Sequence, residues 1–188
     1  GLSPAVDLSL KSTSRIFDLK SVVDQFELEP GMRVADLGSG SGFFTVEMAK
    51  VLGEGGRVAA VDILDTALEV VKARAAESGI RNVEPVRADI EVSGGTFLAD
   101  NSEDFVLLAN VLFQNDEKSG ILKEASRILR PAGRLAVIDW EKGSGGLGPP
   151  DEYRTPRESI LALASGESLI YEKDLIVDAY HFGMVFRK

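Results

Sequence analysis

A nine-residue stretch at 34–42, Val-Ala-Asp-Leu-Gly-Ser-Gly-Ser-Gly, constrains the fold of this chain more than any other segment. The apolar residues around Asp36 are typical of the end of a buried strand. Gly38, Gly40 and Gly42 follow at alternate positions, where they allow the backbone to turn tightly and approach a ligand before a helix opens at Phe43. The stretch therefore predicts a small-molecule site.

The spacing of these glycines indicates which kind of ligand the turn can hold. They form G-x-G-x-G and not the G-x-G-x-x-G of the dinucleotide fingerprint. A carboxylate at position 36, just before the turn, would repel a pyrophosphate at hydrogen-bonding range. Asp36 therefore favours a ligand with a cationic group.

Two further acidic residues stand at the ends of short apolar strands. Asp62 ends a predicted strand at 57–62, 20 residues after Gly42, and Asp89 follows one at 83–88. Parallel strands joined by right-handed crossovers bring such ends to the same sheet edge as the glycine turn. Asp62 could there accept both hydroxyls of a ribose. The simpler alternatives are a strand-end or capping role for Asp62 and a turn-forming role for Asp89.

The stretch at 34–42 resembles the first motif of the class I S-adenosylmethionine-dependent methyltransferases. The phrase Leu-Arg-Pro-Ala-Gly-Arg at 129–134 is similar to a Leu-Lys-Pro-Gly-Gly turn of the same family, with Ala132 in place of one glycine. The resemblance is greatest to the small-molecule branch that methylates quinones and sterols. It implies an α/β fold: a Rossmann-like, doubly wound, seven-stranded, mostly parallel sheet with a C-terminal antiparallel strand pair, in a three-layer α/β/α sandwich.

The resemblance also implies S-adenosylmethionine as cofactor, with S-adenosylhomocysteine as product. Asp36 is expected to act through bound water, Asp89 to meet the adenine amino group, and Asn110 to border cofactor and acceptor. The full set of expected cofactor-binding residues is Asp36, Gly38, Ser39, Gly40, Gly42, Phe43, Asp62, Ile63, Asp89, Ile90 and Asn110.

Apolar patterns predict alternating helices and strands along the chain. Helices are expected at 17–28, after 43, from a capping box at 66–69, after a cap at 115–116 and after 155–156, with room for a short one near Phe97. Strands are expected at 33–37, 57–62, 83–88, from 104 onward, and at 133–140, 168–177 and 181–187.

Composition narrows the class of protein. The 188 residues suit one domain, 1–188, with 1–16 as a flexible arm or a lid over the cofactor. A net charge of -9 disfavours nucleic acid, and the absence of cysteine excludes thiolate metal sites. Asp139 and Glu141 alone are a poor metal site, so no metal is predicted. Neither a bilayer span nor a secretion signal is recognisable, which favours the cytoplasm. A homodimer is left open.

The residues that contact the methyl acceptor are harder to predict. Phe113, Gln114, Trp140 and His181 lie near the predicted strand ends and are the candidates. Methyl transfer from a sulfonium needs chiefly alignment and desolvation, so a general base is optional and no catalytic residue is assigned. The aromatics could equally be core, and a lone histidine in a terminal strand is more often structural.

Two other functions remain compatible with this sequence. One is a nicotinamide-dependent oxidoreductase on the same doubly wound topology, against which the glycine spacing argues. The other is a non-catalytic methyltransferase-like binding subunit, against which the intact acidic strand ends argue.

Overall fold

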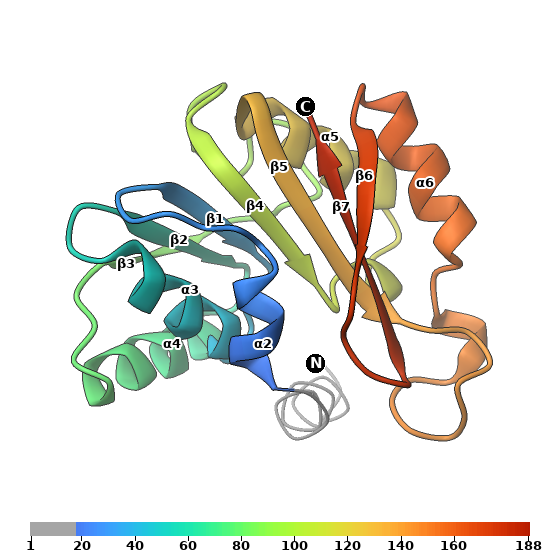
Figure 1. The fold of residues 1–188 in the computed structure, drawn as a ribbon, viewed down its shortest axis with the longest axis horizontal. Helices are drawn as coiled ribbons and strands as arrows, with labels where there is room; N and C mark the ends of the chain where they lie inside the picture. The colour runs from blue at the N-terminus through green and yellow to red at the C-terminus, as the bar shows by residue number, and fades with distance from the viewer. Residues whose placement is uncertain (1–17) are drawn as a thin grey trace.

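The computed structural model describes residues 18–188, so the predicted arm or lid at 1–16 lies outside the described part. Seven strands form one sheet in the order β3-β2-β1-β4-β5-β7-β6 (Figure 1). The strands are β1 Arg33–Leu37, β2 Arg57–Asp62, β3 Val83–Arg87, β4 Glu103–Ala109, β5 Leu129–Trp140, β6 Ile170–Leu175 and β7 His181–Arg187. The helices are α2 Leu19–Asp24, α3 Phe43–Leu52, α4 Asp65–Glu77, α5 Lys118–Ile128 and α6 Arg157–Gly166, with short 3-10 turns η1 Leu112–Gln114 and η2 Asp151–Tyr153.

Strands β1 to β5 pair in parallel, and β7 pairs antiparallel with both β5 and β6. The order reverses direction between β1 and β4, which is the point where a doubly wound sheet binds its ligand. This architecture confirms the predicted mostly parallel sheet with its C-terminal antiparallel pair.

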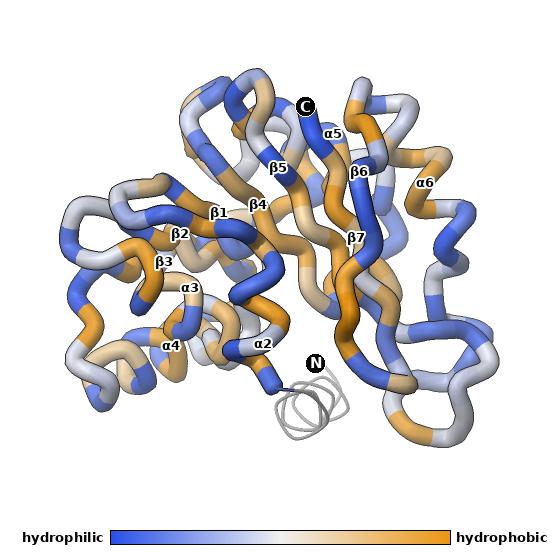
Figure 2. The backbone as a smooth tube through the Cα atoms, viewed as in Figure 1, coloured by the Kyte–Doolittle hydropathy of each residue, from blue (hydrophilic) through white to orange (hydrophobic). Residues whose placement is uncertain are grey.

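Helices cover both faces of the sheet and bury two apolar clusters. One cluster joins α2 and α3 to residues such as Phe105 and Ile138, and the other joins α5 and α6 to residues such as Val106 and Val137. Alternate residues of β4 and β5 therefore point to opposite layers, as expected for strands covered on both faces. Figure 2 shows hydrophobic residues along β4 and β7, which lie between the two helix layers.

Several predicted boundaries were wrong for local physical reasons. Helix α4 begins at Asp65 with Leu64 as its N-cap, so the capping box at 66–69 does not exist. Asn115 does not cap α5, because its side-chain amide donates to the carbonyl of Val111 at 2.6 Å and closes η1 instead. Phe97 adopts a left-handed φ of 60°, which is incompatible with the short helix expected there.

Other boundaries shift by a few residues. Helix α2 ends at Asp24 rather than at 28, and α6 begins after Pro156, which acts as its N-cap. Strand β3 ends at Arg87, β5 already begins at Leu129 and not at 133, and β6 is shortened to 170–175. The early start of β5 requires a register irregularity opposite 103–105 of β4. Within 18–188, no helix is long and apolar enough to cross a bilayer.

Candidate functional site

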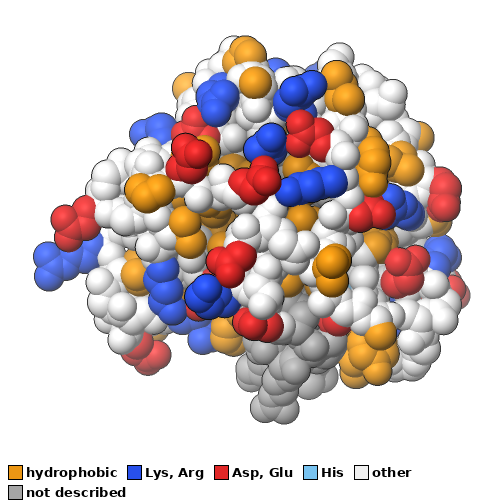
Figure 3. All heavy atoms as spheres, viewed as in Figure 1, with side chains coloured by type: hydrophobic (Ala, Val, Ile, Leu, Met, Phe, Trp, Pro, Cys, Tyr) orange, Lys and Arg blue, Asp and Glu red, His pale blue; other side chains and the backbone are white. Residues whose placement is uncertain are grey.

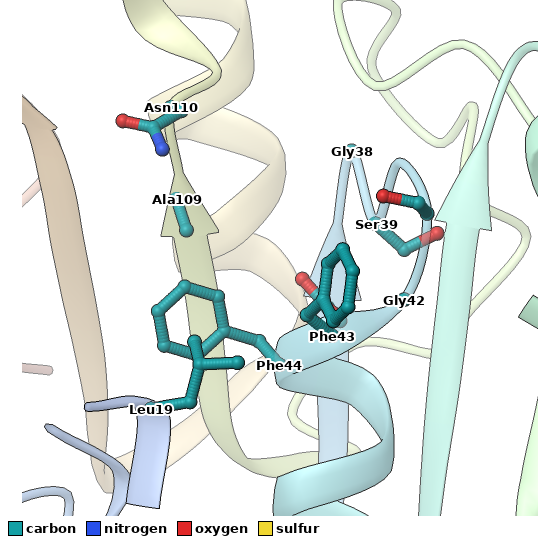
Figure 4. A pocket seen from close by; sticks show the side chains of 10 residues that line it. Leu19, Gly38, Ser39, Gly42, Phe43, Phe44, Ala109 and Asn110 are labelled. Atoms are coloured by element: carbon teal, nitrogen blue, oxygen red, sulfur yellow. The ribbon is translucent and has the colours of Figure 1, made fainter. Parts of the chain in front are cut away.

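A pocket lies where β1 and β4 end and α3 begins. Figure 4 shows the glycine turn on one side of it, and on the other Ala109 at the end of β4 and Asn110 just past it. Its lining brings together six of the predicted cofactor residues: Asp36, Gly38, Ser39, Gly42, Phe43 and Asn110. The other lining residues, which sequence reasoning did not single out, are Leu19, Ser41, Phe44 and Ala109.

The glycine turn depends on close packing as well as on backbone freedom. Gly38 has a φ of +75°, and a Cβ at this position would lie 2.7 Å from Cγ2 of Val111. Gly42, the N-cap of α3, has a φ of +79°, and its Cβ would lie 2.8 Å from Cγ2 of Val71. Both positions therefore admit only glycine without rearrangement. The turn is also anchored to β2, since the N–H groups of Gly38 and Ser39 donate to the carbonyl of Val61 at 2.7 and 3.0 Å.

Asp36 is a buried carboxyl group in the wall of the pocket. The hydroxyl of Thr45, on α3, donates to its Oδ2 at 2.6 Å. Burial raises the pKa of Asp36 to about 7; the charge of Asp62 adds to this rise and the hydrogen bond from Thr45 opposes it. A cationic group brought into the pocket would favour the ionised form of this carboxyl.

Asp62 connects the end of β2 to the glycine turn. Its Oδ2 accepts a hydrogen bond from the N–H of Gly40 at 3.0 Å, and its Oδ1 accepts one from the N–H of Leu64 at 3.0 Å. Neither Gly40 nor Asp62 lines the pocket itself. The next residue, Ile63, is 52% exposed at the sheet edge. The structure thus places Asp62 and Gly40 directly beside the pocket, in contact with each other.

Asp89 and Ile90 follow β3 and do not line the pocket. The Oδ1 of Asp89 accepts from the N–H of Glu91 at 2.9 Å, which is the turn-forming arrangement considered as the alternative. Ile90 is buried in the apolar cluster beneath α5 and α6. A role for these two residues at the adenine ring stays a prediction.

Asn110 lies just past β4 with a left-handed φ of 57°. Its N–H donates to the carbonyl of Ile138 on β5 at 2.8 Å, and its own carbonyl accepts from the side chain of Gln114 at 2.8 Å. This residue therefore joins the cofactor side of the pocket to the ends of β4 and β5.

The four acceptor candidates lie in two places outside the pocket lining. Phe113 and Gln114 belong to η1, directly after Asn110. Trp140 and His181 are paired across β5 and β7, with ring centroids 4.0 Å apart, and both are buried. The structure thus separates the candidates into a loop pair, Phe113 and Gln114, and a ring pair, Trp140 and His181, whose planes are tilted by 37°.

Sequence reasoning missed two residues around the ring pair. Asp178 bonds the ring of His181, and its position three residues earlier could have suggested this. Arg154 lies over the ring of Trp140 at 5.6 Å, a contact that no sequence pattern indicates.

Asp139 and Glu141 flank Trp140 and were weighed as metal ligands. Asp139 is fully buried, and its Oδ1 accepts from the N–H of Trp140 at 2.8 Å. Burial raises the pKa of Asp139 to about 7, although the hydrogen bonds that it accepts from backbone N–H groups act to lower this pKa. Within residues 18–188 there is no group of three or more His, Cys, Asp or Glu side chains placed to hold a metal ion.

The strand order, the antiparallel β7 and the glycine turn define a class I methyltransferase fold. The model of the methyltransferase domain family matches residues 28–159, and the chain belongs to this family. A solved S-adenosylmethionine-dependent methyltransferase from Aquifex aeolicus superimposes with a TM-score of 0.87 at 28% identity, over 100% of this chain and 99% of that one. The cofactor of this class of enzyme is S-adenosylmethionine.

Curated relatives give a more specific but partial match. The chain is 34% identical over 114 residues to the ubiquinone/menaquinone biosynthesis C-methyltransferase UbiE of Shewanella sp. strain ANA-3. This match covers 60% of the chain and 44% of that protein, so the chain spans less than half the length of the curated relatives it matches. The nicotinamide-dependent alternative finds no support in these comparisons.

The fold alone does not fix the reaction. The [4+2]-cyclase SpnF shares it with a TM-score of 0.73 at 15% identity, over 90% of this chain and 80% of that one. The chemistry must therefore be argued from the residues of the site.

Proposed function

We propose that this protein transfers a methyl group from S-adenosylmethionine to a small organic acceptor. One observation supports the proposal most strongly. A buried carboxyl, that of Asp36, and a glycine turn held by Asp62 lie together at the switch point of the sheet. The C-methyltransferase activity of the UbiE relatives favours a carbon atom of the acceptor as the methylation site.

The residues present fit such a cofactor. The hydroxyls of Ser39 and Ser41 are buried in the lining of the pocket, and neither has a hydrogen-bond partner among residues 18–188. Buried polar atoms without partners indicate a ligand or water that satisfies them. Asp36 supplies the negative charge that the cationic amino group of the cofactor requires, and the ring of Phe43 forms part of the wall.

Asp62 and Asp89 complete the proposed cofactor site. Each has carboxylate lone pairs beyond those used by the backbone N–H groups, so Asp62 can accept from ribose hydroxyls and Asp89 from an exocyclic amine. When bound, the cofactor supplies an electrophilic methyl group on a good leaving group. The protein therefore needs chiefly to align the acceptor and exclude water.

Calorimetric titration tests the cofactor. Binding of S-adenosylmethionine and S-adenosylhomocysteine is expected, with NADH producing neither heat nor a thermal shift. The opposite pattern would revive the oxidoreductase and overturn the proposal. Incubation of a metabolite extract with a radioactive methyl donor then tests transfer. Tight cofactor binding without transfer to any acceptor would favour the non-catalytic subunit.

Several properties of the whole protein stay predictions. The acceptor is expected to be a small molecule and not a nucleic acid, and Figure 3 shows acidic and basic side chains intermixed over the face in view. The cytoplasm is the expected location, and a homodimer is an open possibility. Gel filtration with light scattering would measure the oligomeric state.

A further inference from the structure

The ring pair Trp140 and His181 lies on the same side of the sheet as the pocket. Ala109, which lines the pocket, pairs with Ile138 in the register of β4 and β5. Trp140 is two residues beyond Ile138 and so points to the same face, and His181 is its direct partner on β7. The pair therefore continues the wall of the pocket toward the carboxyl end of β5, where an acceptor would meet the methyl group.

Asp178 fixes the orientation of the imidazole. Its carboxylate lies 2.9 and 3.1 Å from Nδ1 of His181. The same carboxylate is itself held by the N–H groups of Tyr180 and His181, each at 2.8 Å. A carboxylate in this position requires a hydrogen on Nδ1, so the neutral ring carries its lone pair on Nε2. Nε2 is thereby a proton acceptor.

Burial, together with the charge of Arg154, favours the neutral form of this ring. Burial lowers the pKa of His181, and the positive charge of Arg154 adds to this effect, while the hydrogen bond and charge of Asp178 oppose it. Asp139, the neighbour of Trp140 on β5, pairs with Phe182 and so points to the opposite face. A neutral imidazole with a carboxylate behind it can accept a proton and stabilise the imidazolium that results.

Trp140 adds a hydrogen-bond donor. Its Nε1 is buried and has no hydrogen-bond partner in the part of the chain that the structure describes. A buried donor without a partner costs free energy unless a ligand or water satisfies it. An indole N–H can only donate, so its natural partner is an oxygen of the ligand.

We infer that His181 is a catalytic base that takes a hydroxyl proton from the methyl acceptor, that Asp178 is its positioning residue, and that Trp140 donates to the acceptor oxygen. This inference rests on the proposed function. A phenol or enol suits this base better than an aliphatic alcohol, because its hydroxyl is the stronger acid and gives up its proton to a neutral imidazole more readily. The buried cation Arg154 disfavours an ammonium acceptor at the same place.

The proton balance is simple. The O–H bond of the acceptor breaks and an N–H bond forms at Nε2, so the positive charge rests on an imidazolium next to Asp178. The freed electron pair, on oxygen or on the ring carbon conjugated with it, forms the bond to the methyl carbon, whose bond to sulfur breaks with its electrons staying on sulfur. After attack by oxygen, His181 loses its proton to solvent. After attack by carbon, that carbon loses its hydrogen as a proton to solvent, and His181 returns its own proton to the oxygen.

The side chains of Trp140 and His181 are both fully buried in this structure. A Cβ on Gly148 would lie 2.6 Å from the indole ring, so the loop at 143–149 packs directly against it. The acceptor therefore reaches the pair only when the surrounding chain opens. Acrylamide quenching of Trp140, the sole tryptophan, measures this opening without any acceptor.

His181 is the sole histidine, so its imidazole nitrogens are the only ones in a ¹⁵N spectrum. We expect a neutral ring at pH 7 with hydrogen on Nδ1, and loss of this preference in Asp178→Asn. Asp174 is an exposed carboxylate on β6. The variant Asp174→Asn should therefore leave the spectrum unchanged and serves as the matched control. Hydrogen on Nε2, or an unchanged spectrum in Asp178→Asn, would overturn the assignment.

Activity tests the acceptor class. With radioactive S-adenosylmethionine, transfer to 1-naphthol or 1,4-dihydroxynaphthalene is expected, and none to 1-naphthylmethylamine, which is an ammonium ion at neutral pH. His181→Gln should lower kcat by at least about 100-fold and remove the rise of kcat with pH, with the Kd for S-adenosylmethionine kept within about twofold. Transfer to the amine, no transfer to either hydroxyl probe, or full activity of His181→Gln would overturn the inference. The cofactor titration, read separately, decides the proposed function.

Discussion

The glycine turn and the loop between Trp140 and Thr155 lie at the same edge of the sheet but are held in different ways. The turn is close-packed, with Gly38 against Val111 and Gly42 against Val71, and its N–H groups bond Val61 and Asp62. The loop contacts Trp140 at Gly148, and many of its hydrogen bonds come from one side chain. Arg154 is buried and donates five hydrogen bonds, to the hydroxyl of Ser144 and to the carbonyls of Glu141, Gly145, Leu147 and Pro149.

This difference predicts how the cofactor end and the acceptor end of the site respond to substitutions. A close-packed turn leaves no space for an added atom, so it keeps one conformation for a cofactor of constant shape. A loop tied largely through one guanidinium is loosened when that one set of hydrogen bonds breaks. The cofactor end is therefore expected to tolerate no enlargement, and the acceptor end to be adjustable.

The largest expected effect is at the turn. Gly38→Ala introduces the contact with Val111 and a left-handed alanine, which together should cost about 3 to 4 kcal/mol of stability and abolish cofactor binding. Thermal unfolding and calorimetry measure both losses. The double variant with Val111→Ala removes the contact but not the backbone strain, so it should recover more than half of the loss.

A matched control separates packing from strain. Gly79 has a φ of +67°, yet nothing lies within 4 Å of its Cβ position. Gly79→Ala should therefore cost only about 1 kcal/mol. Equal losses in Gly38→Ala and Gly79→Ala would show that the turn is not held by close packing.

A third loop, at 94–100, tests whether charge can replace packing. The buried carboxylate of Glu124 accepts from the N–H groups of Gly94 and Thr96, at 3.0 and 3.1 Å, and from Arg127 at 2.7 Å. Although burial acts the other way, these hydrogen bonds lower the pKa of Glu124 to about 2. The carboxylate thus stabilises the fold above its unfolded pKa of 4.5, and this contribution is lost as pH falls toward 2.

Glu124→Gln should lower the free energy of unfolding at pH 7 by about 3 kcal/mol, because the shift of its pKa is worth roughly that much. The difference from the unaltered protein should shrink below about pH 4. Urea denaturation at both pH values measures it. Glu69→Gln, which breaks only an exposed ion pair with Lys72, should change stability by less than about 0.5 kcal/mol. A similar loss in both variants would contradict the role of Glu124.

Arg154→Met tests the acceptor end. Losing the five hydrogen bonds should cost about 2 kcal/mol, since part of the freed carbonyls regain water. Acrylamide quenching of Trp140 should rise, while the Kd for S-adenosylmethionine stays within about twofold. The control is Arg157→Met on α6, which breaks an ion pair with Asp174 of β6. It should leave the quenching unchanged. Unaltered quenching in Arg154→Met would show that the loop is held by something else.

The smallest effect concerns Asp36. Because burial raises the pKa of Asp36 to about 7, the empty pocket binds a cation less well below that pH. The affinity for S-adenosylmethionine should fall by about tenfold per pH unit below 7, which is 1.4 kcal/mol. Asp36→Asn should bind about tenfold more weakly at pH 8 and lose the pH dependence. Calorimetry in two buffers detects the coupled proton release, and its absence would contradict the titration of Asp36.

The contrast between the two ends also explains what the sequence could predict. The sheet and the turn follow from short-range patterns, since buried strands, glycines and strand-end carboxylates lie close together in the chain. The capping role predicted for Asn115 was wrong because its side-chain amide bonds Val111 and not the end of α5. Arg154 was missed because its bonds to carbonyl groups leave no residue-type signature. The contacts of Gly38 with Val111 and of Gly42 with Val71 join segments far apart in sequence, so only the structure could reveal them.

The hydrogen bonds of Asp62 to the N–H groups of Gly40 and Leu64 have a practical consequence. They fix the conformation of the turn through contacts within the protein. Cofactor binding therefore does not have to order this segment, and little conformational entropy is lost there. Crystals of the empty protein should therefore accept the nucleoside by soaking, without cracking or a change of cell. The same preformed shape makes this end of the molecule a suitable template for fragment screening.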